Sequence, residues 1–340
     1  MLRPEHSSAR APLDPVAALI VDEAALARGA AVLVVDDRAG ALAASLLDAG
    51  HDVRAVCDDV RDERALPVGV RVLDSLDAGL AGVDVALLRL PKSLGALEEY
   101  AQALAASGVP RVVAGGRVKH MTRTQNEVLG RSYAGVRASL GRQKCRVLDA
   151  SGPTATPARW PRRHRLDEWG LTVVAHGGAF SPTALDAGTR LLLRNLPDER
   201  RGRAIDLGCG TGVLAAARAR AGDEVVALDA SRAAVASAAA TASENGLTVE
   251  VRRDDGLAGV PDASADLIVS NPPFHRGTDK DSTPTVAMIA DAGRVLVPGG
   301  ELWLVFNAHL PYLGWLRRDV GPSEIVARDR SYLVTRTTAR

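Results

Sequence analysis

The sequence predicts an α/β protein made of two tandem domains, each built on a doubly wound sheet. Residues 203–307 alternate short apolar segments with helix-forming segments. The first half of the chain repeats this order in weaker form, and a stretch rich in Pro, Thr and Arg, residues 151–165, lies between the halves. Alternation of this kind is typical of a mostly parallel sheet with helices on both faces. A chain of 340 residues is long enough for about two such domains.

Elements of the second half follow one another at regular intervals. Asn245-Gly246 is a good stop for a helix, and the alternation at 248–255 is that of a strand. Pro298-Gly299-Gly300 would end the last long helix. We expect strands at 203–208, 224–231, 248–255, 265–273 and 301–307, helices at 213–222, 232–246 and 285–296, and a closing hairpin at 324–338.

The first half is interpreted as a duplicate of the second, although two unrelated α/β domains would show a similar likeness. We expect residues 1–150 to form the first domain, 151–179 a linker and lead-in, and 180–340 the second domain. The first half lacks the glycines of the second, and Arg89-Leu90-Pro91-Lys92 replaces Asn271-Pro272-Pro273-Phe274. The first copy is therefore expected to keep the fold and to have lost the chemistry.

Composition limits the class of protein. The hydrophobic fraction is 46% and the charged fraction 24%, as in globular proteins. The polar start lacks a signal-type apolar segment, and no apolar run approaches the ~18 residues that a membrane span needs. Cys57, Cys145 and Cys209 form no CxxC pair, which argues against zinc and a disulfide framework. We expect a cytoplasmic protein, monomeric, without metal or membrane contact.

Positive charge is concentrated in the middle of the chain. Residues 111–165 hold 13 Lys and Arg but only two acids, Glu127 and Asp149. The clustering predicts a surface that faces a polyanion, with a solvated helix face as the alternative. Trp160 lies among arginines and could stack on a base while they meet phosphates. The alternative is that Trp160 packs on a domain face.

A glycine-rich loop, "DLGCGTG" at residues 206–212, joins a strand to a helix. Gly208, Gly210 and Gly212 permit positive φ and close approach of a ligand. A dinucleotide site would need glycine at Val213, and a P-loop would need Gly-Lys-Ser/Thr, which is absent. A purely structural glycine turn is the remaining alternative.

The loop, together with Asp229 at the end of the next strand, resembles the S-adenosylmethionine loop of class I methyltransferases. The resemblance implies that Asp229 accepts both ribose hydroxyls. It also implies that Asp255, with Asp254 beside it, meets the adenine amino group. Asp206 would lie beside the methionine ammonium and pair with it directly or through water.

Asn271-Pro272-Pro273-Phe274 follows the fourth strand of the second half. An exocyclic amine has its lone pair delocalised into the base, so two acceptors that each take one N–H would aim that pair at a methyl donor. Asn271 Oδ1 and the Pro272 carbonyl suit this role, the prolines fix φ, and Phe274 can stack on a flat acceptor. The segment resembles the motif of methyltransferases that act on adenine N6, guanine N2 or the glutamine amide. The plainer alternative is a turn that starts a helix.

Nearly the whole chain resembles the bacterial ribosomal-RNA guanine-N2 methyltransferases, in which a degenerate methyltransferase domain precedes an active one. The resemblance is carried by "LPKSLGALEEYAQAL", "GRVKHMTRTQN", "AFSPTALDAGTRLLL", "DLGCGTGVLA", "NPPFH" and "GGELWLVFNAHLPY". "GRVKHMT" is closer to the large-subunit (23S) than to the small-subunit (16S) branch. In this family Phe180 and Ser181 would lie over the cofactor, S-adenosylmethionine, and Asp186 would brace their segment.

The family resemblance implies N2 methylation of a guanosine in ribosomal RNA, free or within a subunit, with the first domain in RNA recognition. One alternative is an N5-glutamine methyltransferase that acts on a translation factor. That group usually has Tyr at the place of Phe274 and a small helical N-terminal domain. Another alternative is a non-catalytic RNA-binding factor, which the first half alone would suit.

Overall fold

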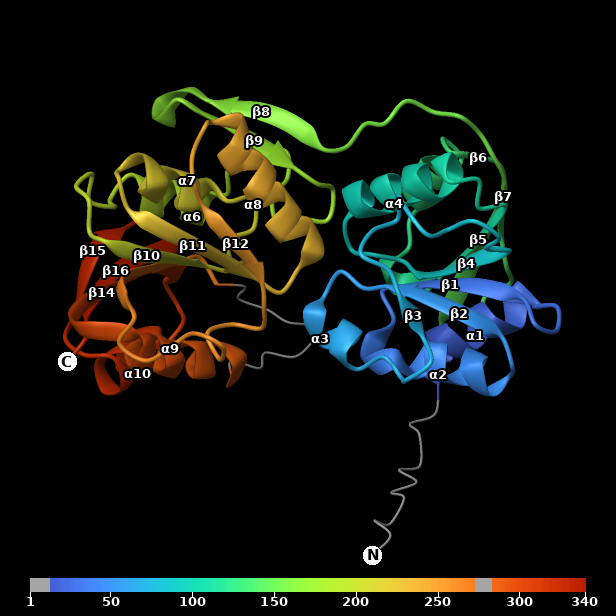
Figure 1. Cartoon of the computed structure of the whole chain (residues 1–340), viewed down its shortest axis with the longest axis horizontal. Coiled ribbons are helices and arrows are strands. Elements are labelled where there is room, and N and C mark those ends of the chain that lie inside the picture. The colour runs from blue at the N-terminus through green and yellow to red at the C-terminus, as the bar shows by residue number, and fades with distance from the viewer. Residues whose placement is uncertain (1–12, 273–282) are drawn as a thin grey trace, which may run out of the picture. The chain divides into compact units, whose positions relative to one another are not determined.

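The computed structural model describes residues 13–272 and 283–340. It divides into two compact units, Met1–Arg159 and Trp160–Arg340. Each unit is a seven-stranded sheet with helices on its faces (Figure 1). The predicted α/β class is confirmed.

The first unit has the strand order β3-β2-β1-β4-β5-β7-β6. The first five strands in this order are parallel, and β7 and β6 are antiparallel to their neighbours. The strands are β1 (Ala31–Val35), β2 (Asp52–Val56), β3 (Arg71–Val72), β4 (Val85–Arg89), β5 (Arg111–Arg117), β6 (Tyr133–Ala138) and β7 (Cys145–Pro153). The helices are α1 (Pro15–Ala24), α2 (Ala41–Asp48), α3 (Val60–Arg64), α4 (Leu94–Ala106) and α5 (Arg123–Leu129), with 3₁₀ turns η1 (Arg38–Gly40) and η2 (Val118–His120).

The second unit repeats this topology strand for strand, in the order β12-β11-β10-β13-β14-β16-β15. Its strands are β10 (Arg203–Leu207), β11 (Glu224–Asp229), β12 (Glu250–Arg253), β13 (Ala265–Ser270), β14 (Leu296–Asn307), β15 (Ser323–Arg328) and β16 (Tyr332–Thr338). Its helices are α6 (Ala187–Leu193), α7 (Val213–Arg220), α8 (Arg232–Glu244), α9 (Thr283–Val295) and α10 (Tyr312–Asp319). Two sheets of identical order support the predicted duplication.

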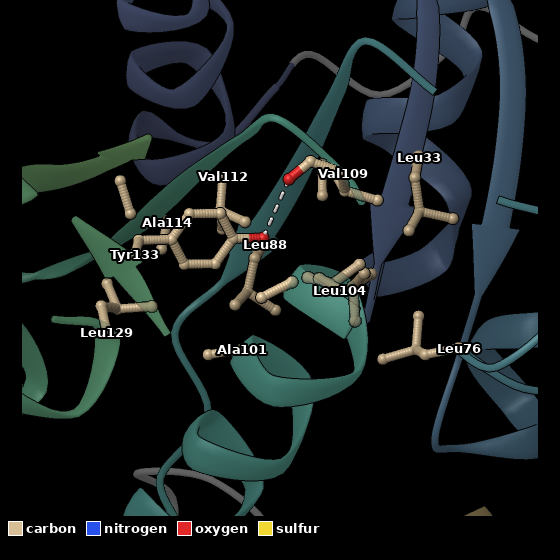
Figure 2. Packing of buried hydrophobic residues seen from close by; sticks show 14 of the residues in the cluster. Leu33, Leu76, Leu88, Ala101, Leu104, Val109, Val112, Ala114, Leu129 and Tyr133 are labelled. Atoms are coloured by element: carbon tan, nitrogen blue, oxygen red, sulfur yellow. Dashed lines mark hydrogen bonds between the residues drawn. The ribbon is translucent and has the colours of Figure 1, made fainter. Parts of the chain in front are cut away.

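The core of the first unit consists mainly of Ala, Val and Leu, as the aromatic content of 3% requires. Figure 2 shows part of it, where Leu88 and Val112 from the sheet meet Leu104 from α4. Tyr133 is fully buried there, and its hydroxyl donates a hydrogen bond to the Val109 carbonyl at 3.2 Å. This bond satisfies the one polar atom of a side chain that otherwise packs like Phe.

Residues 160–179 belong to the second unit and are not the linker that the sequence predicts. β8 (Arg162–Leu166) and β9 (Leu171–Ala175) form a hairpin, joined by the 3₁₀ turn η3 (Asp167–Trp169), and β9 lies against α8. The edge of β9 that does not pair with β8 forms hydrogen bonds with side chains of α8 and of Asn245, the residue directly after it. Thr241 Oγ1 accepts from the Val174 N–H at 3.0 Å, and Ser237 and Asn245 accept from His176 and Thr172. Polar residues four apart thus replace a neighbouring strand.

Trp160 is 9% exposed, and the Arg162 guanidinium lies 4.2 Å from its ring centre. The base-stacking hypothesis for Trp160 is therefore wrong, because little of the ring is exposed and an arginine already lies over it. The alternative, that Trp160 packs on a domain face, agrees with this burial.

Strand β14 also differs from the sequence prediction. It begins at Leu296, immediately after α9, and includes Pro298-Gly299-Gly300. The break that these residues predict is present as an irregular register, because Ala265 pairs with Leu296 whereas Leu267 pairs with Glu301. Helices α6 and α10 were not predicted as helices, and β12 is shorter than expected.

Candidate active site

The glycine loop connects β10 to α7 and is tied to β11. The Gly208 and Cys209 N–H groups both donate to the Leu228 carbonyl, at 2.8 and 3.0 Å. Gly208, Gly210 and Gly212 have φ of 73°, 52° and 76°, in the region that favours glycine. A Cβ on Gly212 would lie 2.6 Å from Ala238 Cα of α8, whereas a Cβ on Gly208 would meet nothing within 4 Å. Gly212 thus permits helix packing, and Gly208 leaves space open beside the loop.

Asp229 ends β11 and faces the glycine loop. Its Oδ2 accepts from the Gly210 N–H at 3.0 Å and its Oδ1 from the Ser231 N–H at 2.9 Å. The Asp254 N–H donates to the Asp229 carbonyl at 3.0 Å, which places Asp254 and Asp255 next to the end of β11. All three carboxylates are half-buried at the carboxyl edge of the sheet, where ligands bind in doubly wound folds.

Asp206 lies within β10 and is fully buried. Its Oδ2 accepts from the Ala215 N–H of α7 at 2.8 Å, and its Oδ1 has no hydrogen-bond partner among the described residues. Burial, with a smaller contribution from the charge of Asp229, raises the pKa of Asp206 to about 7. Because the side chain is not exposed, contact with a ligand through water fits this geometry better than direct pairing.

Asn271 follows β13, and its amide is held from one side. Nδ2 donates to Asp186 Oδ2 at 3.0 Å and to Thr189 Oγ1 at 2.8 Å, so both amide hydrogens are used. Asn271 Oδ1 is buried without a partner among the described residues. The amide therefore presents one free acceptor in a fixed orientation. Pro272 is buried beside it, whereas Phe274 lies outside the described residues.

One pocket of the second unit brings several predicted residues together. Asn271, Gly208 and Gly210 line it with Phe180 and Ser181 from the segment before α6. Phe180 is 62% exposed, and the Ser181 hydroxyl donates to the Ala184 carbonyl at 2.9 Å. The other lining residues are His164, Ala184, Leu185, Asp186, Thr189, Cys209, Thr211, Val213 and Leu214.

Asp206, Asp229, Asp255, Gly212 and Pro272 do not line this pocket. Asp206 is buried within β10, and Asp229 and Asp255 lie at or just after the ends of the neighbouring strands β11 and β12. Sequence reasoning did not single out Thr189 and His164, which do line it. The feature of the sequence that could have identified Thr189 as a site residue is its place in the polar first turn of α6.

The first unit shows why only the second carries this site. An interval of 172 residues separates Gly40 from Gly212 and Asp36 from Gly208. The backbone supports this equivalence, because the Asp36 N–H donates to Val56 O as Gly208 does to Leu228 O. The sheet register makes Arg89 equivalent to Asn271, because Val35 pairs with Leu88 as Leu207 pairs with Ser270. Gly40 begins α2 with φ of 69°, so the prediction that the first half lacks the loop glycines is wrong at this position.

The other loop positions of the first unit do not suit a ligand. Asp36 takes the place of Gly208, with a half-buried side chain that accepts from the Asp58 N–H at 2.9 Å. Burial raises the pKa of Asp36 to about 6. Cys57, a buried thiol, takes the place of Asp229. The side chain of Asp36 and the loss of the strand-end carboxylate explain the predicted loss of chemistry.

The sheet order, the glycine loop and the strand-end acid together define a class I methyltransferase. Residues 170–336 match the Methyltransferase small domain, and residues 17–154 match the RLMG N-terminal domain. Ribosomal RNA large subunit methyltransferase G of Streptomyces coelicolor is 42% identical over 328 residues, which cover 89% of this chain and 86% of that protein. The protein of the same name from Pseudomonas aeruginosa PAO1 is 36% identical, with 89% and 86% covered. The chain belongs to the ribosomal RNA large subunit methyltransferase G family.

A solved structure shows the same two-unit fold. It is that of the 16S rRNA N2 G1207 methyltransferase of T. thermophilus in complex with AdoMet and guanosine, with a TM-score of 0.80. It is 22% identical to this chain, and the match covers 96% of this chain and 92% of that one. The described residues contain no helix long and apolar enough to cross a membrane.

We predict that Gly212→Ala destabilises the second unit more than Gly208→Ala. Both substitutions force alanine into positive φ, at about 1–2 kcal/mol, but only Gly212→Ala overpacks α8, which adds about 1–3 kcal/mol. Urea unfolding followed by tryptophan fluorescence reports on this unit alone, because all four tryptophans lie in residues 160–340. Equal losses of stability would contradict the assignment of Gly212 to helix packing.

Proposed function

We propose that this protein transfers the methyl group of S-adenosylmethionine to the exocyclic N2 amine of a guanosine in large-subunit ribosomal RNA. The observation that carries the proposal is Asn271 Oδ1, a buried acceptor without a partner among the described residues, fixed beside the glycine loop. Relatives that cover most of the chain are named as large-subunit ribosomal RNA methyltransferases. This supports the 23S branch over the 16S branch.

The residues at the carboxyl edge of the second sheet suit S-adenosylmethionine. Gly208 leaves open space beside backbone groups, and the buried Asp206 Oδ1 is a free acceptor on the side proposed for the ammonium. Asp229 is proposed to accept from the ribose hydroxyls and Asp255 from the adenine amino group. Phe180 and Ser181 line the same pocket as Gly208 and Gly210. When bound, the cofactor supplies a methyl group on a positively charged sulfur.

Asn271 has the chemistry that an aromatic amine acceptor requires. Its Oδ1 would accept one amine N–H, and the Pro272 carbonyl is proposed to accept the other. Taking both hydrogens out of the plane of the base directs the lone pair of the nitrogen toward the methyl group. The methylated nitrogen is a strong acid and can lose its proton to water, so no strong base is needed. Phe274 is proposed to stack on the base.

The first unit is proposed to bind RNA through one edge of its sheet. Arg111, Arg137 and Arg142 are used in ion pairs with acids of the same unit. Five exposed cations nearby take part in no ion pair among the described residues: Arg117, Lys119, Arg123, Lys144 and Arg146. We call these five residues the basic edge.

A hollow lies beside two residues of the basic edge, Arg123 and Arg146. The rest of its lining is mixed: Val118, Met121, Ala138 and Leu148 are apolar, and Thr122, Asn126 and Glu127 are polar. Cations can contact phosphates, and the apolar part of such a lining can accept an unstacked base.

The two alternatives have less support. A glutamine-amide methyltransferase would be expected to carry a small helical N-terminal domain, whereas this first unit is a complete α/β copy. A non-catalytic factor would not require the fixed acceptor of Asn271. We also propose that the protein is a monomer and that it is located in the cytoplasm. A ribosomal RNA substrate supports the cytoplasmic location.

The proposed function is tested with purified protein, methyl-labelled S-adenosylmethionine and 23S ribosomal RNA from cells that lack the gene. We expect label in N2-methylguanosine by nucleoside mass spectrometry. Asn271→Ala should retain cofactor binding and lose about 10²-fold or more in turnover, whereas Asp229→Ala should mainly weaken cofactor binding. Label in adenosine, in the glutamine of a release factor, or nowhere would contradict the proposal.

Cofactor affinity should rise with pH through Asp206. Its pKa is about 7 in the free protein, and a nearby ammonium would favour the ionised carboxylate, so binding should release a proton. Affinity should therefore increase severalfold from about pH 6 to 7.5. Above this range the ligand's own amino group, with a pKa of roughly 7.8, begins to lose its charge. Calorimetric titration of wild type and Asp206→Asn tests this. The variant should bind more weakly with little pH dependence, and a flat wild-type profile would refute the role.

Removing charge from the basic edge should weaken RNA binding. Arg123→Ala combined with Arg146→Ala should lower affinity about 10-fold and reduce the salt slope by roughly 2. Arg71→Ala is the matched control, since Arg71 is an exposed cation on β3, at the opposite edge of the same sheet. Filter binding at several salt concentrations measures both quantities. Similar losses for the control and the double variant would place the RNA elsewhere.

A further inference from the structure

We propose that Asp186 and Thr189 are positioning residues that hold the Asn271 amide with Oδ1 toward the acceptor amine. The inference rests on the proposed methyl transfer and adds two residues to its machinery. Neither residue donates to or accepts from the substrate in this proposal. They act by fixing which of the two amide atoms faces it.

The hydrogen bonds leave the amide one orientation. Asp186 precedes α6, and its Oδ2 accepts from both the Thr189 N–H at 3.1 Å and Asn271 Nδ2 at 3.0 Å. Thr189 Oγ1 accepts the second amide hydrogen at 2.8 Å. A half-turn of the amide would bring Oδ1 against a carboxylate and leave a buried N–H without its acceptor, which costs at least about 1–3 kcal/mol.

Gly188 lies between Asp186 and Thr189, and the structure explains why this position is glycine. A Cβ on Gly188 would lie 3.1 Å from both Asp186 Oδ2 and Tyr332 Cε1. Tyr332 belongs to β16 and packs against this turn, and burial and then the charge of Asp186 raise the pKa of its hydroxyl. Any side chain at position 188 would press on the oxygen that holds Asn271. The order Asp-Ala-Gly-Thr thus matches the contacts of the first turn of α6.

The first unit contains the same architecture without the free acceptor. Asp14 precedes α1 and accepts from the Val16 and Ala17 N–H groups, at 2.8 and 3.0 Å, and it forms an ion pair with Arg89. Asp14 and Ala17 stand 172 residues before Asp186 and Thr189, and Arg89 takes the place of Asn271 in the sheet register. The contact between a helix cap and the end of the fourth strand is therefore common to both units. The amide and the hydroxyl acceptor occur only in the second.

Two substitutions separate positioning from helix capping. Asp186→Ser keeps a good capping residue, but its single, shorter hydroxyl cannot also hold Asn271. Thr189→Val has nearly the same shape and removes only the acceptor. We expect each to lower the single-turnover methyl transfer rate roughly 10- to 100-fold, with cofactor affinity and RNA affinity within about twofold of wild type. Thr189→Ser should restore most of the rate.

The first unit provides the matched control. Asp14→Ser makes the same change at the equivalent cap and breaks the contact with Arg89. It should leave the single-turnover rate within about twofold of wild type, since no acceptor is held there. Parallel loss of rate in Asp14→Ser would show that the cap acts through stability.

An independent readout uses the amide itself. The chain has five asparagines, Asn126, Asn195, Asn245, Asn271 and Asn307, so asparagine-selective ¹⁵N labelling gives few side-chain amide signals. The signal that disappears in Asn271→Ala identifies Asn271. Its hydrogens should exchange slowly with solvent in wild type and at least about 10-fold faster in Asp186→Ser and Thr189→Val.

The outcomes are distinct. A wild-type protein that methylates no ribosomal RNA refutes the proposed function, and the positioning role falls with it. An active wild type whose Thr189→Val and Asp186→Ser variants keep their rate refutes the positioning role alone. Loss of rate together with equal loss of cofactor binding would show a structural role. Loss of rate and faster amide exchange, with binding retained and Thr189→Ser active, supports the proposal.

Discussion

The site of this protein depends on the two hydrogen bonds that the Asn271 amide donates to Asp186 and Thr189. They connect the end of a central strand to the first turn of α6, and they leave Oδ1 as the only polar atom of that side chain without a partner among the described residues. Ser270, one residue earlier, ties this strand to β10 through its bond to the Leu207 carbonyl at 2.7 Å. The glycine loop begins directly after Leu207, so the acceptor and the cofactor loop are positioned by the same pair of strands.

Comparison of the two units separates architecture from chemistry. Both have the same sheet order, a glycine that begins the helix after the first long strand, and an aspartate cap beside the end of the fourth strand. The first unit nevertheless has Asp36, Cys57 and Arg89 where the second has Gly208, Asp229 and Asn271. The same fold therefore forms with either set of three residues at these positions. We propose that ligand binding explains the identity of the second set, and that the exposed cations of the first unit serve a separate function in RNA binding.

Much of this organisation could be predicted from local sequence. The glycine loop, the strand-end acid and the Asn-Pro-Pro segment each lie within a few residues, and their resemblance to methyltransferase motifs identified them. The role of Thr189 could not be predicted, because it lies 82 residues from Asn271 and meets it only in the folded sheet. The hairpin at 162–175 was missed because helix side chains, in place of a third strand, satisfy β9. Trp160 was misassigned because neighbouring arginines in the sequence do not reveal burial.

The central claim is that the second unit, through Asn271, methylates N2 of a guanosine in large-subunit ribosomal RNA. The most direct measurement compares 23S ribosomal RNA from three strains by nucleoside mass spectrometry: wild type, a gene deletion, and a chromosomal Asn271→Ala replacement with the protein present at normal level. The account predicts that one N2-methylguanosine per 23S molecule is lost equally in the deletion and the replacement. Retention of that nucleoside in the replacement strain, or an unchanged content in the deletion, would contradict it.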